Sequence, residues 1–214
     1  KYSDICVFSF HPVKIITTAE GGLATTNSKE LEEKMKLLRT HYITKDQSKF
    51  ELINYANWSY EQQGLGFNYR MNDIQAALGL SQLKRISRII EERNTILNNY
   101  KNSINDPNIS FLKIGKNIKS AVHLVIIILN NISEEKHKEV FNEMRQRNIG
   151  VQLHYSPIHL QPYYRKLGFK KGDFPKSEEY SRKALSLPVF EGIEDYQQQY
   201  VIKCLLDIVY NLKV

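Results

Sequence analysis

The first apolar segment of the chain is short and dense. Residues 5–10 are mostly hydrophobic, which is typical of a buried strand. Pro12 restricts the residue before it and ends regular strand pairing. Residues 21–26 then resume an extended pattern. The pattern therefore predicts two strands joined by a connection that carries Lys14.

A helix is expected next. Asn27, with Glu30 three residues later, resembles a capping box. Hydrophobic side chains follow at helical spacing, at Leu31, Met35 and Leu38. This spacing predicts a helix over residues 28–40. Residues 42–63, by contrast, mix charged, polar and aromatic side chains without a sustained period, which predicts a long irregular segment with a functional or interface role.

The longest helical period begins at Asn72. Apolar and small side chains continue at helical spacing to about Tyr100, and the sequence Asn-Asp-Pro at residues 105–107 ends the pattern. The positions that carry the period are Ile74, Ala77, Leu78, Ser81, Ile86, Ile89 and Ile90. We expect one long helix that bridges two subdomains.

The remainder of the chain alternates between strand and helix patterns. Strands are expected over residues 121–129 and 151–155, and helices over residues 134–148, 176–186 and 195–211. Pro157 and Pro162 bracket a loop after the second of these strands. This alternation predicts a small α+β domain.

Composition narrows the class of protein. A chain of 214 residues that is 42% hydrophobic suits a folded globular protein with one large or two small domains. The longest apolar run, residues 124–129, is too short to cross a membrane, and no secretory leader opens the sequence, so a cytoplasmic protein is expected. Cys6 and Cys204 have no His or Cys neighbours at metal-ligand spacing, which predicts two core thiols and no metal site.

The formal charge of +7 has two interpretations. Lysines and arginines are interleaved with glutamates along the expected helices, so most of the charge is expected on solvated surface. The basic residues form no clustered stripe, so a nucleic-acid-binding function is the weakest hypothesis. A net positive charge also suits a phosphorylated cofactor and a diphosphate-bearing substrate.

Lys14 is the first candidate for chemistry because apolar residues flank it. A lysine amine is a nucleophile toward aldehydes only when it is deprotonated, which desolvation or a nearby cation can achieve. Most lysines are solvated surface groups, however. Spacing alone therefore leaves a surface lysine as the alternative interpretation.

Three blocks of sequence carry a resemblance to a known family. They are Ser-Phe-His-Pro-Val-Lys at residues 9–14 followed by Thr-Thr-Ala-Glu-Gly-Gly at residues 17–22, Gly-Phe-Asn-Tyr-Arg-Met-Asn at residues 66–72, and residues 151–164. Together they resemble the DegT/StrS-type sugar-nucleotide aminotransferases, a branch of fold-type-I pyridoxal-phosphate (PLP) enzymes. The first block is similar to the cofactor-lysine signature of that family, the second to another family block, and the third to the segment that faces the sugar nucleotide.

The resemblance implies an α/β fold, the carboxy-terminal portion of a fold-type-I PLP-dependent transferase. Residues 1–71 would form the end of the large-domain sheet with the cofactor lysine. Residues 72–104 would form the bridging helix, and residues 105–214 the small α+β domain. The His-Pro-Val-Lys and Leu-His-Tyr-Ser-Pro-Ile-His sequences are most similar to the UDP-sugar 4-aminotransferases of pseudaminic acid synthesis.

The resemblance also implies a role for each cofactor-binding residue. Lys14 would hold PLP as a Schiff base and then shuttle the proton between substrate and cofactor carbons. Ser9 would donate its hydroxyl to the cofactor phosphate, although a routine strand-end serine is the alternative. Asn68 would donate its amide to that phosphate from the partner subunit, which implies a homodimer with shared active sites.

Substrate contacts are expected from one segment of the small domain. Its side chains and backbone would line the pocket through Leu153, His154, Tyr155 and Ser156. The alternative is that His154 and Tyr155 are packed, hydrogen-bonded residues at a strand end. Arg70 and His159 are weaker candidates, and residues 20–22 are interpreted as a tight turn that lets backbone approach the lysine.

The implied reaction moves an amino group, expected from glutamate, to the C4 keto carbon of a UDP-linked deoxy sugar. The family's upstream phosphate-binding loop, ring-stacking aromatic residue and pyridinium-pairing aspartate are not in this sequence, so the chain alone is expected to be a poor catalyst. Two alternatives remain. One is a non-catalytic folding or dimerisation module, and the other is a related aminotransferase for another nucleotide sugar.

Overall fold

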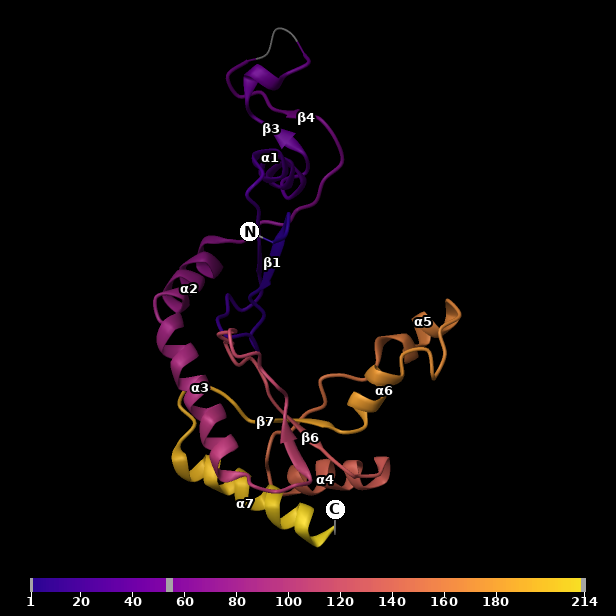
Figure 1. Ribbon diagram of the computed structural model, residues 1–214. Coiled ribbons are helices and arrows are strands. Elements are labelled where there is room, and N and C mark those ends of the chain that lie inside the picture. The colour runs from indigo at the N-terminus through magenta and orange to yellow at the C-terminus, as the bar shows by residue number, and fades with distance from the viewer. Residues whose placement is uncertain (1, 53–55, 213–214) are drawn as a thin grey trace. The chain divides into compact units, whose positions relative to one another are not determined.

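The chain divides into two compact units, Lys1–Ile86 and Ser87–Val214. Figure 1 shows the computed structural model, which describes residues 2–52 and 56–212. Within those ranges, no helix has both the length and the apolar character that crossing a membrane requires. The same ranges hold no group of three or more His, Cys, Asp or Glu side chains that could bind a metal ion.

The first unit begins with the two predicted strands. β1 (Cys6–Ser9) pairs antiparallel with β2 (Gly22–Thr25), with Cys6 opposite Thr25 and Ser9 opposite Gly22. All eight positions are exposed, so the predicted burial of this strand, and of the Cys6 thiol with it, is wrong for this chain. The physical reason is that a sheet of two strands cannot cover its own faces.

The helix that follows is α1 (Lys29–Leu38). Its N-cap is Ser28 and not the predicted Asn27, because the Ser28 hydroxyl accepts a hydrogen bond from the backbone N–H of Leu31 at 3.3 Å. The segment after it is largely irregular, as predicted. It contains the short pair β3 (Ile43–Thr44) and β4 (Glu61–Gln62) and the 3-10 turn η1 (Gln47–Lys49), and its residues 53–55 lie outside the described ranges.

The predicted single long helix is two helices, α2 (Asp73–Leu83) and α3 (Ile86–Ser103). The capping box at Asn72 and Gln75 starts α2 where the sequence indicated. The regular helical hydrogen bonds of α2 end at Lys84 and Arg85. The N–H groups of both residues contact the carbonyl of Gln82, which tightens the last turn. Apolar spacing continues across this break, so the hydrophobic period could not reveal it.

The second unit is built on a three-stranded antiparallel sheet. β6 (Val125–Leu129) is its central strand, between β5 (Ile109–Phe111) and β7 (Ala184–Leu187). Alternate residues of β6 are fully buried, at Val125, Ile127 and Leu129. They join a single hydrophobic cluster with residues of α3, α4 (Glu134–Gln146) and α7 (Asp195–Asn211). α4 and α7 pack against each other, as Figure 1 shows.

Several boundaries in this unit differ from prediction. Residues 151–155 form no strand, only an isolated bridge between Gln152 and Ser186. The helix expected over residues 176–186 ends early, as α6 (Pro175–Ser181), because the next residues become β7, all four of which are buried. The strand expected over residues 121–129 is shorter, as β6. The loop between the prolines contains η2 (Ile158–Leu160), and α5 (Pro162–Lys166) follows it. The predictions for α4 and α7 are confirmed.

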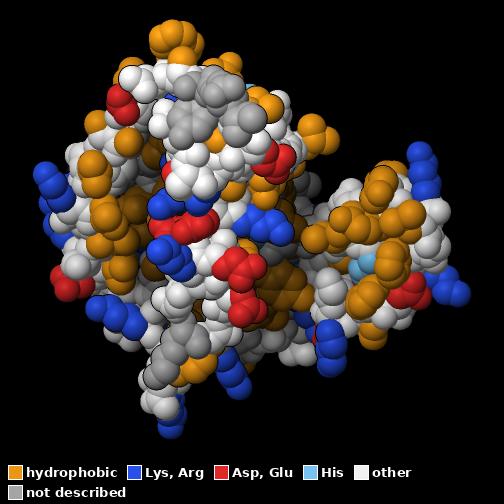
Figure 2. Space-filling model, turned by 90° about the horizontal axis from the view of Figure 1, so that it is seen from above, with side chains coloured by type: hydrophobic (Ala, Val, Ile, Leu, Met, Phe, Trp, Pro, Cys, Tyr) orange, Lys and Arg blue, Asp and Glu red, His pale blue; other side chains and the backbone are white. Residues whose placement is uncertain are grey.

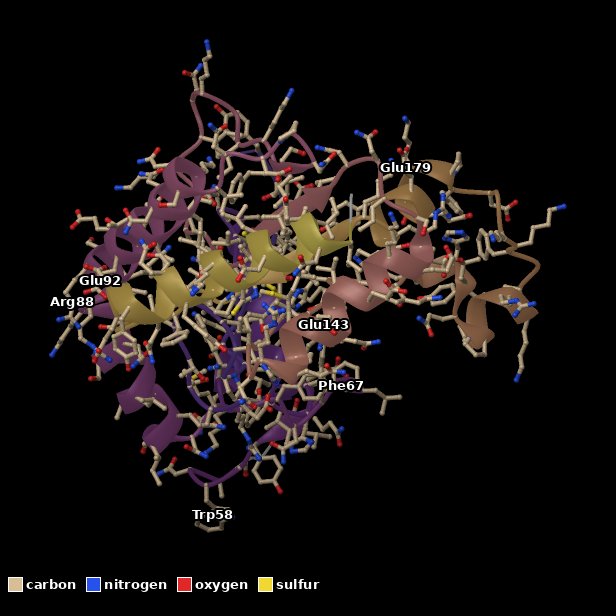
Figure 3. All side chains as sticks on the ribbon, turned by 90° about the horizontal axis from the view of Figure 1, so that it is seen from below. Trp58, Phe67, Arg88, Glu92, Glu143 and Glu179 are labelled. Carbon is tan, nitrogen blue, oxygen red and sulfur yellow. The ribbon has the colours of Figure 1, made fainter. Side chains whose placement is uncertain are left out.

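Polar contacts hold the ends of the core elements. The Tyr100 hydroxyl of α3 donates to the carbonyl of Pro188 at 3.1 Å, and burial raises the pKa of this phenol. At the start of α3, Arg88 pairs with Glu92 and with Glu191, which fixes the turn before α7 to α3. Figure 3 shows Arg88 and Glu92 side by side. Cys204 is buried in the core, as predicted.

Candidate functional site

The connection between β1 and β2, which carries Lys14, is tightly hydrogen-bonded. The carbonyl of Phe10 accepts from the backbone N–H of Thr18 and from the Thr17 hydroxyl, both at 3.0 Å. The N–H of Lys14 donates to the carbonyl of His11 at 2.9 Å, which closes a turn at the lysine. The Lys14 side chain is half-buried. These hydrogen bonds therefore fix the backbone that carries Lys14.

Close packing at Gly21 supports this turn. A Cβ at Gly21 would lie 2.2 Å from the Thr18 hydroxyl oxygen. That hydroxyl is buried and donates to the carbonyl of Glu20 at 2.8 Å, so it has little freedom to move away. The geometry agrees with the interpretation of residues 20–22 as a tight turn. The Glu20 carboxylate itself is exposed, 4.0 Å from the His11 imidazole.

Ser9 and Asn68, the two predicted phosphate ligands, lie on different segments of the first unit. Ser9 ends β1, is exposed, and its hydroxyl accepts a long hydrogen bond of 3.5 Å from the N–H of His11. Asn68 is exposed in a bridge with Thr40, where neighbouring N–H groups reach the carbonyls at the end of α1. Ser9 therefore shares the connection of Lys14, whereas Asn68 belongs to a separate segment.

Gly66 determines the path of the Asn68 segment. A Cβ there would lie 2.5 Å from the backbone nitrogen of Tyr42 and 2.8 Å from the carbonyl oxygen of Leu38. Because both neighbours are backbone atoms, neither can rotate away. Only glycine allows this approach.

The carboxylate of Glu61 organises the irregular segment before it. It is buried and accepts from the N–H groups of Glu51 and Leu52, each at 2.8 Å. Burial raises the pKa of Glu61, but these backbone donors outweigh that effect and hold it below its usual range. No sequence pattern indicates this role, because an isolated glutamate in a polar stretch is usually solvated.

The groups predicted to bind a cofactor fit PLP chemically. Lys14 supplies a primary amine that can condense with an aldehyde, on a connection of fixed backbone. Ser9 supplies a hydroxyl donor and Asn68 an amide donor, and both kinds of group bind phosphate oxygens. Their roles stay predictions.

A cavity of about 910 Å³ in the second unit brings all four predicted substrate residues together. Leu153, His154, Tyr155 and Ser156 form one wall of it. Much of the remaining lining comes from α4 and the α6–β7 connection, with His137, Lys138, Phe141 and Arg182 among its residues. This volume is in the range of ligand pockets. The sequence could not indicate His137 or Arg182, because only folding brings them beside residues 153–156.

The wall that contains His154 is fixed by hydrogen bonds. The Tyr180 hydroxyl donates to the carbonyl of His154 at 3.1 Å, and burial raises the pKa of Tyr180, which keeps that donor protonated. The His154 ring packs edge-on to Tyr155, with ring centroids 4.7 Å apart, and the peptide bond between them is cis. His154 and Leu153 are partly buried, whereas Tyr155 and Ser156 are exposed.

Charge at the cavity rim is mixed. Lys138 and Glu134 form an ion pair at 2.9 Å, and their hydrogen bond raises the pKa of Lys138 and lowers that of Glu134. Arg182 adds a second cation to the lining. Because Lys138 already pairs with Glu134, the positive charge of Arg182 is left over on this lining and can attract an anionic group.

His159 has a structural role. It is buried, and its Nε2 lies 2.9 Å from the Glu178 carboxylate, which also accepts from the N–H of Gly172 at 2.7 Å. Hydrogen bonds from His159 and Gly172 lower the pKa of Glu178. The Phe174 ring contacts His159, and further exposed apolar side chains lie on α5 and on the α5–α6 connection: Tyr163, Tyr164, Leu167 and Phe169. Figure 2 shows them gathered at the right of the view.

Comparisons with known proteins agree with the sequence blocks. The model of the DegT/DnrJ/EryC1/StrS aminotransferase family matches residues 1–206. A UDP-4-amino-4,6-dideoxy-N-acetyl-β-L-altrosamine transaminase from Campylobacter jejuni is 34% identical over 214 residues, covering 100% of this chain and 54% of that protein. The chain spans about half the length of the curated relatives it matches.

Solved structures give the same result. Helicobacter pylori PseC, an aminotransferase of pseudaminic acid biosynthesis, matches with a TM-score of 0.88 and 31% identity over 98% of this chain and 54% of that one. Spr1654 from Streptococcus pneumoniae in its PMP form matches with a TM-score of 0.90 and 28% identity, over 98% of this chain and 54% of that one. These matches confirm the predicted α/β fold class, with the chain corresponding to about half of such an enzyme.

Proposed function

Because the chain belongs to the DegT/DnrJ/EryC1/StrS aminotransferase family, we propose that the protein containing it is a PLP-dependent sugar-nucleotide aminotransferase. The observation that carries the proposal is the position of Lys14. It stands on a hydrogen-bonded turn directly after β1, inside a sequence block that matches this family, with the Ser9 hydroxyl at the start of the same connection.

Each predicted cofactor ligand has a defined task in this proposal. PLP supplies an aldehyde for covalent attachment and an electron sink for the reacting carbon. Lys14 Nζ holds the cofactor and, once released, moves the proton at the substrate carbon. The Ser9 hydroxyl and the Asn68 amide donate to the phosphate, Asn68 from the partner subunit. The active form is therefore a homodimer.

The proposed substrates are a UDP-linked 4-keto deoxy sugar and glutamate, in a pathway of the pseudaminic acid type. The names of the Campylobacter jejuni and Helicobacter pylori relatives support this choice. The sugar nucleotide would occupy the cavity lined by residues 153–156, where cationic Lys138 and Arg182 suit a diphosphate. We propose a cytoplasmic location, where nucleotide sugars are made.

Covalent trapping tests the cofactor assignment. The full-length protein is incubated with PLP, reduced with borohydride, digested and mapped by mass spectrometry. The label is expected on Lys14 and absent from a Lys14→Ala variant, while Lys45→Ala, which removes an exposed lysine of the same unit, keeps it. A label on another lysine of the wild-type protein would contradict the assignment.

Substrate comparison tests the finer proposal. Amino transfer from glutamate is measured with UDP-linked and dTDP-linked 4-keto sugars under the same conditions. Faster turnover of the UDP-linked sugar supports a pseudaminic-type enzyme. Preference for the dTDP-linked sugar would instead identify a related aminotransferase for another nucleotide sugar.

A non-catalytic folding or dimerisation module is the second candidate function. It is favoured by α2, which has no buried residue and exposes Ile74, Leu80 and Leu83 as an interface helix would. A yellow chromophore formed by the full-length protein with PLP would exclude this function. A colourless dimer would support it.

A further inference from the structure

Ser186 is a buried hydroxyl beside the candidate substrate cavity. It lies in β7 with 5% of its surface exposed. Its Oγ is 2.5 Å from His154 Nδ1 and 2.9 Å from the carbonyl oxygen of Gln152. The backbone N–H of Ser186 also donates to that carbonyl, at 2.8 Å. Both His154 and Gln152 line the cavity.

The hydrogen bonds of Ser186 indicate where the protons lie. A serine hydroxyl has one proton to donate. The Ser186 hydroxyl donates this proton to the Gln152 carbonyl, at 2.9 Å. The short contact to His154 can then be a hydrogen bond only if Nδ1 carries a proton and donates it to Ser186 Oγ. In the neutral ring Nε2 therefore has no proton and can only accept.

We propose that Ser186 is a positioning residue that fixes this tautomer of His154, so that Nε2 accepts a hydrogen bond from the nucleotide sugar. The inference rests on the proposed function, which assigns His154 to substrate binding. The Tyr180 hydroxyl on the His154 carbonyl and the Tyr155 ring against the imidazole hold the rest of the residue, so Ser186 determines the proton position on a ring whose place is already set.

The tautomer determines which chemical group His154 recognises. An acceptor nitrogen pairs with a hydroxyl or an amide N–H and does not pair with a phosphate oxygen, which is itself an acceptor. His154 therefore contacts the sugar or the base of the substrate. The cations Lys138 and Arg182 on other parts of the lining suit the diphosphate.

The tautomer is measured on the full-length protein without substrate. Histidine labelled with ¹⁵N is examined by long-range ¹H–¹⁵N NMR, with His154 assigned by loss of its signals in His154→Gln. The Nδ1–H tautomer is expected in the wild type and in the Ser110→Ala control, whose hydroxyl lies in β5 beside Asn130. Ser186→Ala should populate the Nε2–H form, and Ser186→Thr, which keeps the hydroxyl, should restore Nδ1–H. An Nε2–H wild-type ring would overturn the proposal, whether or not any variant folds.

Kinetics test the link to substrate. Ser186→Ala should raise KM for the nucleotide sugar roughly three- to tenfold, the effect of about one hydrogen bond, and leave KM for glutamate unchanged. Ser186→Thr should recover most of the loss. If Ser186→Ala changes the tautomer but not KM in an active enzyme, the inference is wrong. If the wild type aminates no nucleotide sugar, the proposed function fails, while the tautomer result stands separately.

Discussion

The two units of the chain differ in how they bury hydrophobic side chains. Every buried hydrophobic residue among the described ranges belongs to Ser87–Val214. In Lys1–Ile86 the described buried residues are polar, at Thr18, Thr44 and Glu61, and α1 and α2 bury nothing. The second unit thus has a core of its own. The first unit is held by backbone hydrogen bonds and turns, and its described apolar side chains are not buried within it.

That contrast separates two kinds of functional prediction. The cavity of the second unit is formed by that unit alone, so its lining can be described residue by residue. Lys14, the proposed cofactor lysine of the first unit, stands on an ordered turn, but the strand beside it exposes Val7 and Phe8. A closed pocket around Lys14 would need further protein, which agrees with a chain that spans about half of its relatives.

Separating the two units should give the largest difference in cooperative unfolding. Residues 87–214 produced alone are expected to unfold cooperatively in urea, because the core of β5, β6 and β7 with its helices is contained within them. Residues 1–86 alone are expected to show no cooperative transition. Circular dichroism across a urea gradient makes the measurement. A cooperative transition in the first unit alone would break the comparison.

A core truncation should have the next largest effect. Ile127→Ala removes a side chain with no exposed surface at the centre of the sheet and should cost about 2–5 kcal/mol of unfolding free energy. Val7→Ala, in a strand residue that is 76% exposed, should change the stability of this chain by no more than about 0.5 kcal/mol. Measured again in the full-length protein, a larger cost for Val7→Ala would indicate that β1 is covered there.

Two glycines provide a smaller, matched comparison. Gly66→Ala places a Cβ against the backbone of Tyr42 and should destabilise the full-length protein by about 1–3 kcal/mol and weaken PLP binding through the displaced Asn68 segment. Gly150→Ala meets nothing within 4 Å and should be neutral or stabilising by up to about 1 kcal/mol. Thermal unfolding and PLP titration measure both. Equal effects would show that the close approach at Gly66 is not required.

The smallest effect concerns pH and the α5–α6 segment. The pKa of Glu178 is lowered by hydrogen bonds from His159 and Gly172, so the carboxylate contributes stability above its ordinary value of 4.5. That contribution is lost as pH falls through the depressed folded-state pKa. The protection factors of residues 159–178 in hydrogen exchange, corrected for the intrinsic exchange rate at each pH, should therefore fall in acid. Glu178→Gln should be less stable at neutral pH with a flatter pH dependence, whereas Glu139→Gln, an exposed carboxylate on α4, should match the wild type.

Sequence patterns predicted the elements whose signals are local. The two strands around Lys14, the helix after them, the start of α2 at Asn72 and the full extent of α7 follow from spacing, caps and breakers over a few residues. The family resemblance likewise proposed Lys14 and the four residues at 153–156 as site candidates, since motifs are contiguous; their roles stay predictions. These parts needed no tertiary information.

Only tertiary structure decided the rest, because burial and pairing depend on residues far apart in the chain. Ala184–Leu187 has a composition that suits a helix, yet it is the third strand because β6 pairs with it and the core buries it. The exposure of Cys6 and the burial of His159 against Glu178 depend likewise on what packs beside them. The Ser186 hydroxyl reaches His154 across 32 positions, a contact that only the folded sheet edge creates.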